Sequence, residues 1–273
     1  MADQTIFITG ATDGIGMLTA TALAKQKTHL LLHGRNQEKL DKVIKEIKTL
    51  SGNQNIEGFV ADFSSMNEVR QLAKDILARH DKIDILINNA GAGFAASRYG
   101  KDGTELRMAV NYFAPFLLTN LLLPALKKGA PSRIVNVSSA GQSPVNFDDI
   151  MMEKNFDGVT AYCQSKLALI MFTIDLAEEL KEDNVTVNAL HPGTYLDTNM
   201  VRDANIKPQG IPQSGANAEL YLATSPELKN VSGKYFNVKK EAKANAQAYD
   251  AKARKRLKEL SLQLTMLEEA VEQ

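Results

Sequence analysis

The chain has 273 residues, enough for one large α/β domain with a buried core. Its 44% hydrophobic and 23% charged residues are ordinary for a globular protein and exclude a disordered chain. Thirty-two basic residues balance thirty-two acidic ones, so no nucleic-acid partner is expected. The single cysteine, Cys163, excludes an intramolecular disulfide and indicates a reducing compartment, the cytoplasm.

Strand-like and helix-like segments alternate along the chain, which predicts βαβ units and a parallel sheet. The expected strands are residues 5–9, 29–32, 56–61, 84–87, 133–137, 186–190 and 233–238. The expected helices are residues 15–25, 38–50, a helix opened by a capping box at Ser65 and Glu68, 104–127 and 162–182.

Membrane segments are not expected from the apolar runs. The strand at 5–9 begins without a basic leader or an apolar segment before it, so no signal peptide is predicted. No apolar stretch reaches the 18 or so residues of a membrane span. The longest, 113–123, is interrupted by Pro115, Thr119 and Asn120 and is expected to be a buried helix.

The carboxyl-terminal segment has a different pattern. Apolar residues at 257, 260, 264, 267 and 271 lie on one stripe of an amphipathic helix. We therefore expect residues 1–240 to form one folded domain and residues 241–273 to be a helical extension of it. The stripe is expected to pack on its own domain, with a homodimer contact as the alternative.

Three glycines, Gly10, Gly14 and Gly16, lie between the first strand and the first helix. A residue without a Cβ takes unusual dihedral angles and lets a phosphate approach the backbone. The helix behind it offers unpaired N–H groups and a positive dipole end. This loop, with Asp13 and Ile15, is predicted to bind a dinucleotide pyrophosphate; a merely structural tight turn is the alternative.

The second strand ends at Arg35 and Asn36, where an acidic residue would select NAD. A guanidinium instead suits a 2′-phosphate, which it binds through paired hydrogen bonds. The sequence therefore favours NADP(H) over NAD(H), with both residues beside the adenosine. The alternative is that Arg35 stacks on the adenine or points into solvent.

Tyr162 and Lys166 lie four residues apart, on one face of a helix. Hydride transfer to a carbonyl leaves an alkoxide that needs a proton donor. A free tyrosine has a pKa near 10, but a neighbouring ammonium and an oxidised nicotinamide both favour the phenolate. The pair therefore predicts acid–base chemistry for an oxidoreductase, and Lys166 can also bind the nicotinamide ribose.

Together with Asn88-Asn-Ala-Gly91 and Val137-Ser-Ser139, these motifs resemble the short-chain dehydrogenase/reductase family from about residue 4 to about residue 238. The resemblance implies a single Rossmann-type doubly wound parallel sheet with helices on both faces. It implies that Ser139 polarises the substrate oxygen and that Asn111 completes a proton relay with Tyr162 and Lys166. The further cofactor-binding residues that it implies are Asp62, Phe63, Asn89, Ala90, Gly91, Pro192, Gly193 and Thr194.

One departure from the usual family pattern is the long connection between Ser139 and Tyr162. Its extra residues, about 144–158, are rich in Phe and Met and resemble the retinol-dehydrogenase-like branch, as does Ser232-Gly-Lys-Tyr-Phe236. Such a connection is expected to form a wall or lid of the substrate pocket. The expected pocket residues are Phe94, Met151, Met152, Tyr195 and Met200.

The combined expectation is a cytoplasmic NADP(H)-dependent oxidoreductase that moves a hydride between the nicotinamide and the carbonyl or alcohol of an apolar small molecule, without a metal. The first alternative is a non-catalytic NADP-binding regulator or scaffold, which has no need for the full set of Tyr, Lys, Ser and Asn. The second is a sugar-nucleotide epimerase or dehydratase, which usually has another glycine spacing and a larger carboxyl-terminal domain.

Overall fold

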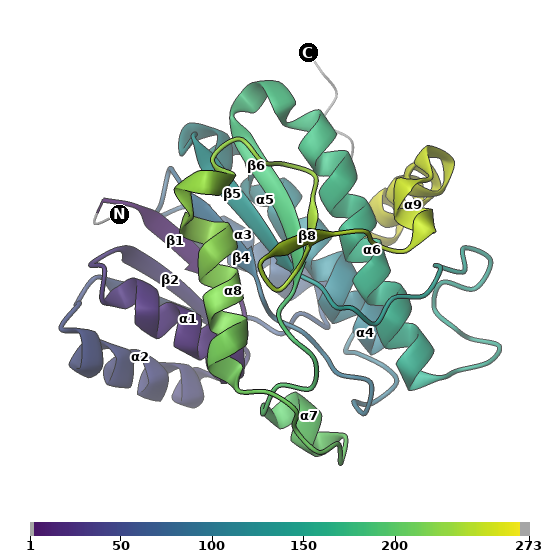
Figure 1. Ribbon diagram of the computed structural model, residues 1–273, viewed down its shortest axis with the longest axis horizontal. Helices are drawn as coiled ribbons and strands as arrows, with labels where there is room; N and C mark the ends of the chain where they lie inside the picture. Colours follow the sequence, from purple (N-terminus) through teal and green to yellow (C-terminus); the bar gives the residue numbers. More distant parts are fainter. Residues whose placement is uncertain (1–2, 268–273) are drawn as a thin grey trace.

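The computed structural model describes residues 3–267 and contains one eight-stranded sheet (Figure 1). Its strands are β1 (Thr5–Ile8), β2 (His29–Gly34), β3 (Ile56–Val60), β4 (Ile85–Asn88), β5 (Ser132–Val137), β6 (Val185–His191), β7 (Tyr235–Asn237) and β8 (Lys240–Ala242). They lie in the order β3-β2-β1-β4-β5-β6-β7-β8, and only β8 is antiparallel to its neighbour. The order reverses between β1 and β4, and open α/β sheets bind their ligands at the carboxyl ends of the strands at such a point.

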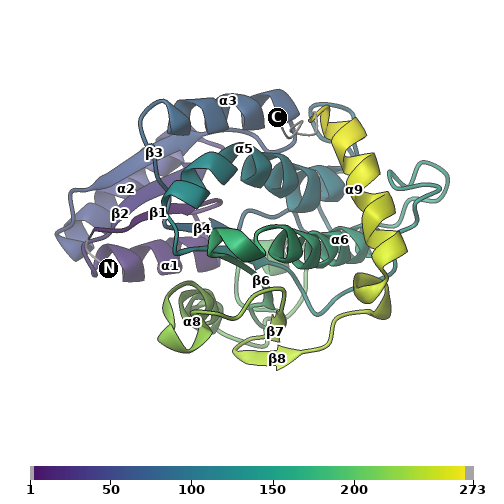
Figure 2. The ribbon, with the colours of Figure 1, turned by 90° about the horizontal axis from the view of Figure 1, so that it is seen from above.

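Helices cover both faces of this sheet. They are α1 (Gly14–Ala24), α2 (Gln37–Ser51), α3 (Met66–Leu77), α4 (Leu106–Met108), α5 (Ala114–Lys128), α6 (Gly158–Glu179), α7 (Asn199–Asp203), α8 (Pro212–Thr224) and α9 (Ala251–Thr265). Figure 2 shows α3 and α5 on one side of the sheet and α1 and α8 on the other. The expected doubly wound parallel sheet is therefore confirmed, with β8 as an added antiparallel edge.

The central strands β1, β4 and β5 are mostly apolar because both of their faces are buried. Every residue of β1 is buried, and its side chains alternate between two cores. Phe7 packs in the core that includes residues of α3, α5 and α6, whereas Ile6 and Ile8 pack in the core that includes residues of α1, α2 and α8. The two cores hold the carboxyl ends of β1, β4 and β5 side by side.

The expected helix at 104–127 is interrupted by a π turn, η1 (Ala109–Phe113), between α4 and α5. The N–H of Ala114 bonds to the carbonyl of Ala109, five residues earlier, and Pro115 has no N–H to donate to Asn111. The most apolar 18-residue part of Leu106–Lys128 has a mean hydropathy of 1.4, and the stretch is long enough to cross a membrane. The expectation that no apolar stretch has that length was therefore wrong, but 72% of its most apolar part is buried, as in a core helix.

Two helix starts differ from the expectation. Helix α6 begins at Gly158 rather than at Tyr162, because Asp157 caps it by accepting from the N–H (2.8 Å) and hydroxyl (2.5 Å) of Thr160. The expected capping box of α3 does not form, since the Ser65 side chain makes no capping bond. Asp102 from a distant loop instead accepts from the N–H of Met66 at 2.7 Å.

The carboxyl-terminal segment also differs. Residues 240–242 pair as β8 before the helix α9 begins, so the segment is not helical throughout. Leu257 is buried as expected, but Leu264 is 38% exposed and Ser261 and Thr265 are fully buried. The buried face is thus rotated from the apolar stripe, because Ser261 hydrogen-bonds to the hydroxyl of Tyr112 (2.6 Å) in the domain. The expected stripe position 271 lies outside the described residues.

Candidate active site

The glycine loop lies at the carboxyl end of β1, against the turn that follows β4. Gly10 has a φ of +65° and Gly14 a φ of +51°, in the region that favours glycine. A Cβ on Gly10 would lie 2.7 Å from the Ala90 Cα, and one on Gly16 would lie 2.3 Å from the Asn89 Nδ2. The cradle therefore requires these glycines, as expected of a loop whose backbone a pyrophosphate approaches closely.

The turn after β4 is bonded directly to this loop. Asn89 Nδ2 donates to the carbonyls of Thr9 (2.8 Å) and Gly10 (2.9 Å). The Thr9 hydroxyl accepts from the N–H groups of Asn89 and Ala90, both at 3.0 Å. A buried bond between Asn88 and Asn136 (2.8 Å) joins β4 to β5. These contacts fix the turn against the glycine loop and join β4 to β5.

Asp13 caps the first helix rather than leaving its N-terminus open. Its carboxylate accepts from the Gly14 N–H (2.7 Å), from Lys39 Nζ (3.0 Å) and from Asn199 Nδ2. Burial raises the pKa of Asp13, but these hydrogen bonds and the Lys39 charge outweigh it, so the net pKa is lowered. Lys39 is a basic group beside the loop that sequence reasoning missed, since it lies 26 residues from Asp13. Ile15 packs towards α8, where a Cβ on Gly215 would lie 2.8 Å from its Cδ1.

His33, which the sequence analysis did not select, holds the loop from the second strand. Its Nδ1 accepts from the Gly10 N–H at 3.2 Å, and its Nε2 lies 2.9 Å from the carbonyl of Ala61. The ring stacks on Phe63 with centroids 4.2 Å apart. Burial lowers the pKa of His33 to about 4, so the ring is neutral at physiological pH and carries its proton on Nε2. It therefore positions the loop without adding a charge.

The expected adenosine-binding residues lie at the ends of β2 and β3. Arg35 is exposed directly after β2, where a 2′-phosphate is expected. Asn36 caps α2 by accepting from the Lys39 N–H at 2.8 Å. Asp62 accepts from the N–H of Ser64 at 2.9 Å, and Phe63 is buried against His33, so its side chain faces the core and only its backbone can face a cofactor.

The four expected catalytic residues come from three elements. Ser139 follows β5, Tyr162 and Lys166 lie on α6, and Asn111 lies in the π turn. Lys166 Nζ donates to the Val137 carbonyl at 2.9 Å and lies 5.8 Å from the Tyr162 ring centroid. These residues therefore converge at the carboxyl end of β5.

Gly91 separates two of these side chains. A Cβ on Gly91 would lie 3.3 Å from the Asn111 Oδ1 and 3.6 Å from the Lys166 Nζ. Asn111 also donates to the Ser165 hydroxyl at 2.9 Å, and that hydroxyl donates to the Tyr162 carbonyl at 2.7 Å. Ser165, to which no role was assigned from the motif, thus connects the π turn to α6.

The pKa of Tyr162 is shifted opposite to the expectation. Burial raises it, and the hydrogen bond with Ser139 offsets only part of the rise. Burial also lowers the pKa of Lys166 to about 8. The expected lowering by the lysine is wrong for the protein groups alone, because desolvation of the phenol outweighs it. Further positive charge beside the phenol is needed to favour the phenolate.

The loop after β6 contains the expected Pro192, Gly193 and Thr194. Gly193 has a φ of +137°, and the Thr194 hydroxyl lies 3.1 Å from His191 Nε2. Burial lowers the pKa of His191, whose Nδ1 has no partner among the described residues. His191 is a second buried histidine at this edge that the sequence analysis missed.

The expected pocket residues divide into two groups. The Phe94 ring meets the Tyr162 ring edge-on, with centroids 5.9 Å apart, and a Cβ on Gly93 would lie 2.6 Å from Met200 Cγ. Tyr195, in the loop after β6, is 39% exposed and has a φ of +44°.

In the second group, Met151 packs against the core, and Met152 is buried with a φ of +51°. Their place in the pocket stays a prediction.

Three possible metal ligands, His29, Glu57 and His80, lie at the opposite, amino-terminal edge of the sheet. Glu57 Oε1 is 2.8 Å from His29 Nε2 and 3.3 Å from His80 Nε2, and Arg79 donates to Oε2 at 3.2 Å. The carboxylate is thus bonded on both oxygens within the protein. This group is separate from the site around Tyr162.

Comparisons with known proteins agree with this geometry. Residues 4–209 match the family model described as short chain dehydrogenase. Retinol dehydrogenase 13 of Mus musculus is 37% identical over 272 residues, covering 93% of this chain and 81% of that protein. Polyprenol dehydrogenase of Homo sapiens is 35% identical over 281 residues, covering 96% of this chain and 85% of that protein.

Solved structures are similar over most of the chain. An uncharacterized protein from Mycobacterium paratuberculosis has a TM-score of 0.78 at 28% identity, covering 96% of this chain and 93% of that one. A short chain dehydrogenase from Escherichia coli, complexed with NADPH, has a TM-score of 0.70 at 29% identity, covering 86% of this chain and 96% of that one.

Proposed function

Because this chain belongs to the short-chain dehydrogenase/reductase family, in its retinol-dehydrogenase-like branch, we propose that it is an NADP(H)-dependent oxidoreductase acting on the carbonyl or alcohol of an apolar small molecule. The observation that carries the proposal is the convergence of Ser139, Tyr162 and Lys166 at one strand end, with Lys166 Nζ 5.8 Å from the Tyr162 ring centroid. Such a group serves proton transfer to a reacting oxygen.

In the proposed reaction the cofactor carries the hydride, and the protein residues hold the substrate oxygen and move the proton. A bound nicotinamide supplies or accepts the hydride. Tyr162 donates the proton to the carbonyl oxygen in the reducing direction, and Ser139 holds that oxygen by donating its hydroxyl hydrogen. Lys166, buried with its ammonium near the phenol ring, stabilises the phenolate that remains. Asn111 Oδ1 accepts from the Ala92 N–H at 2.7 Å and so holds the segment after β4 beside the site.

The preference for NADP(H) is supported by two basic groups. Arg35 is exposed at the end of β2, and Lys39 extends from the first turn of α2 to the glycine loop. A 2′-phosphate carries charge that both can neutralise, whereas a 2′-hydroxyl gains less from them. The related chain crystallised with NADPH supports the same preference.

The expected cofactor contacts of the glycine loop and of residues 62–63, 89–91 and 192–194 are part of this proposal. An apolar substrate is supported by the names of the relatives, retinol and polyprenol dehydrogenases, and by Phe94 and Met200 beside the site. We also retain residues 1–240 as the catalytic domain, with 241–273 as its extension. We also propose a cytoplasmic location, which the single cysteine supports. A homodimer is a further proposal.

Substituting Tyr162→Phe tests the function. A panel of ketones and aldehydes with NADPH, followed by the nicotinamide absorbance, should show turnover by the wild-type protein and none by the variant. NADPH affinity, measured by the fluorescence of NADPH itself because the chain has no tryptophan, should stay within about twofold, since only the proton donor is lost. A wild-type protein that binds NADPH but reduces no carbonyl would support the non-catalytic alternative instead.

A further inference from the structure

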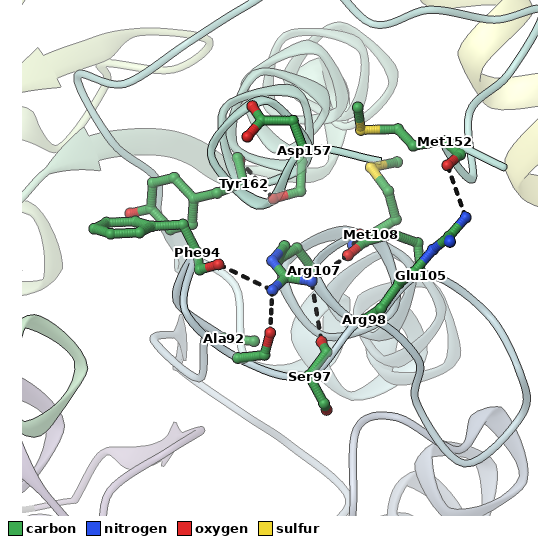
Figure 3. Close-up of polar contacts among 12 residues, drawn as sticks. Ala92, Phe94, Ser97, Arg98, Glu105, Arg107, Met108, Met152, Asp157 and Tyr162 are labelled. Carbon is green, nitrogen blue, oxygen red and sulfur yellow. Dashed lines mark hydrogen bonds and ion pairs between the residues drawn. The ribbon is translucent and has the colours of Figure 1, made fainter. Parts of the chain in front are cut away.

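A fully buried arginine, Arg107, contacts the segment 94–97, whose Phe94 ring packs against Tyr162. Arg107 on α4 has a side chain only 1% exposed, and that of its partner Glu105 is 0% exposed. Arg107 Nη1 donates to Glu105 Oε1 at 2.6 Å and to the Ser97 carbonyl at 3.0 Å (Figure 3). Its Nη2 donates to the carbonyls of Phe94 (3.0 Å) and Ala96. One guanidinium therefore holds three carbonyls of an irregular segment, residues 94–97.

The same guanidinium contacts the connection between Ser139 and Tyr162. The Phe156 ring centroid lies 5.2 Å from Arg107 Cζ and 4.9 Å from Arg98 Cζ, so two cations flank one ring. Arg98 Nη2 also donates to the carbonyls of Met152 (3.0 Å) and Glu153 (3.3 Å). The two arginines thus join residues 94–98 to residues 152–156, two segments far apart in the sequence.

Both joined segments lead to the reacting phenol. The Phe94 ring meets the Tyr162 ring edge-on at 5.9 Å, and Figure 3 shows Arg107 beside Phe94, bonded to its carbonyl. A Cβ on Gly158, the first residue of α6, would lie 2.4 Å from the Phe94 carbonyl and 3.5 Å from Arg107 Nη2. The start of the helix that carries Tyr162 is therefore packed directly on the carbonyl that Arg107 holds.

The chemistry of the guanidinium suits this place. It offers five N–H donors in a planar fork, so it can hold several carbonyls and a carboxylate at once. A lysine ammonium has its three donors on one nitrogen and does not reproduce this planar arrangement. A buried ion pair is weak evidence for stability, because apolar residues of equal volume often serve the fold as well. The buried guanidinium, in contrast, needs acceptors for its N–H groups, and the carbonyls of the irregular segment 94–97 supply them.

We propose that Arg107 is a positioning residue that holds the Phe94 and Phe156 segments against each other and so sets the shape of the substrate wall beside Tyr162. This inference rests on the proposed oxidoreductase function. Because displacements of about 1 Å near a reacting centre change rates up to about a hundredfold, loosening this wall changes which substrates are bound productively. In the proposed function NADPH is bound by other residues, those of the glycine loop and of the turns after β2, β4 and β6.

Arg107→Lys and Arg107→Gln test the proposal, and Arg254 offers a matched control. Arg254 is also a buried arginine, 9% exposed, paired with Asp175 at 2.5 Å and Glu178 at 3.4 Å, but it joins α9 to α6. The same two substitutions at Arg254 therefore remove a buried ion pair away from the substrate wall. For each variant, kcat and KM are measured with NADPH over carbonyl substrates of increasing size, with NADPH affinity and hydrogen exchange of residues 93–98 and 150–158.

We expect the KM for the largest substrates to rise about tenfold or more in the Arg107 variants, with NADPH affinity changed less than about twofold. Hydrogen exchange should rise in both segments. The Arg254 variants should lose stability without either change. Equal size profiles for the Arg107 variants, the Arg254 variants and the wild-type protein would overturn the proposal.

Two outcomes need a second readout. If the Arg107 variants do not fold, Phe156→Leu, at a ring 37% exposed, tests the same contact and should shift the size profile in the same direction; an unchanged profile would overturn the proposal. If the wild-type protein reduces no carbonyl, the proposed function has failed. The exchange of both segments in the Arg107 variants, compared with the Arg254 variants, then decides whether the arginine joins them.

Discussion

Glu219 on α8 gives the sharpest prediction about stability. The side chain is fully buried against α1, where its Oε2 accepts from the Thr19 hydroxyl at 2.7 Å and its Oε1 has no partner among the described residues. Burial raises the pKa of Glu219 from 4.5 to about 8, and the bond from Thr19 offsets only part of this rise. The carboxyl group is therefore protonated in the folded protein at neutral pH.

The sign and size of the effect follow from that pKa. A group whose pKa is raised in the folded state stabilises the fold fully below the unfolded pKa of 4.5, and this contribution is lost as the pH rises through about 8. The difference between 4.5 and about 8 corresponds to about 5 kcal/mol, at 1.36 kcal/mol per pH unit. Relaxation around the charged carboxylate makes this an upper bound.

Glu219→Gln removes the titration but keeps an acceptor for Thr19. We expect the free energy of unfolding of the variant, relative to the wild-type protein, to increase between pH 5 and pH 8 by up to about 4 kcal/mol. Urea unfolding of both proteins at each pH measures it. Glu259→Gln, at an exposed position on α9, is the control. A difference between variant and wild type that stays constant with pH would refute the buried, protonated state of Glu219.

Three predictions concern the site. Lys166→Ala should abolish reduction of carbonyls and weaken NADPH binding about ten- to a hundredfold in a fluorescence titration, since the proposed lysine serves both phenol and ribose; intact binding would remove its role at the ribose. Arg35→Asp should reverse the cofactor preference, because a carboxylate repels the 2′-phosphate, and titration of both cofactors should show a loss of roughly 1.5–3 kcal/mol for NADPH; a wild-type preference for NADH would contradict the assignment. Replacing Met151 and Met152 by serine should raise KM for apolar carbonyls at unchanged NADPH affinity, and unaltered kinetics over large and small substrates would show that this segment faces away.

The features that the sequence predicted well depend on local physics. The buried strands are visible as apolar runs because both of their faces are covered. The requirement for Gly10 is visible because a positive φ and a close approach to the backbone both exclude a side chain. The spacing of Tyr162 and Lys166 needs only the helical period. None of these predictions required knowledge of which distant segments meet.

The features that were missed depend on tertiary contacts. Ser65 has the right neighbours for a capping box, but Asp102, 36 residues from Met66, provides the cap. In the sequence His33 is indistinguishable from any other strand residue. Its role becomes visible only in the structure, where its ring is bonded to Gly10 and Ala61. The direction of the Tyr162 pKa shift also depends on how deeply the phenol is buried, which spacing does not reveal.

The wide turn at Ala109–Phe113 has a consequence for the lengths that this chain tolerates. It holds one residue more per turn than an α-helix, which is the geometry left by a single insertion into a helix. Deleting Val110 would restore a regular helix but rotate everything before it by about 100° relative to α5. Glu105 and Arg107 would then leave the face on which they meet the substrate wall. A change in length at this turn should therefore disturb the wall that Arg107 holds, from a position outside the 144–158 connection.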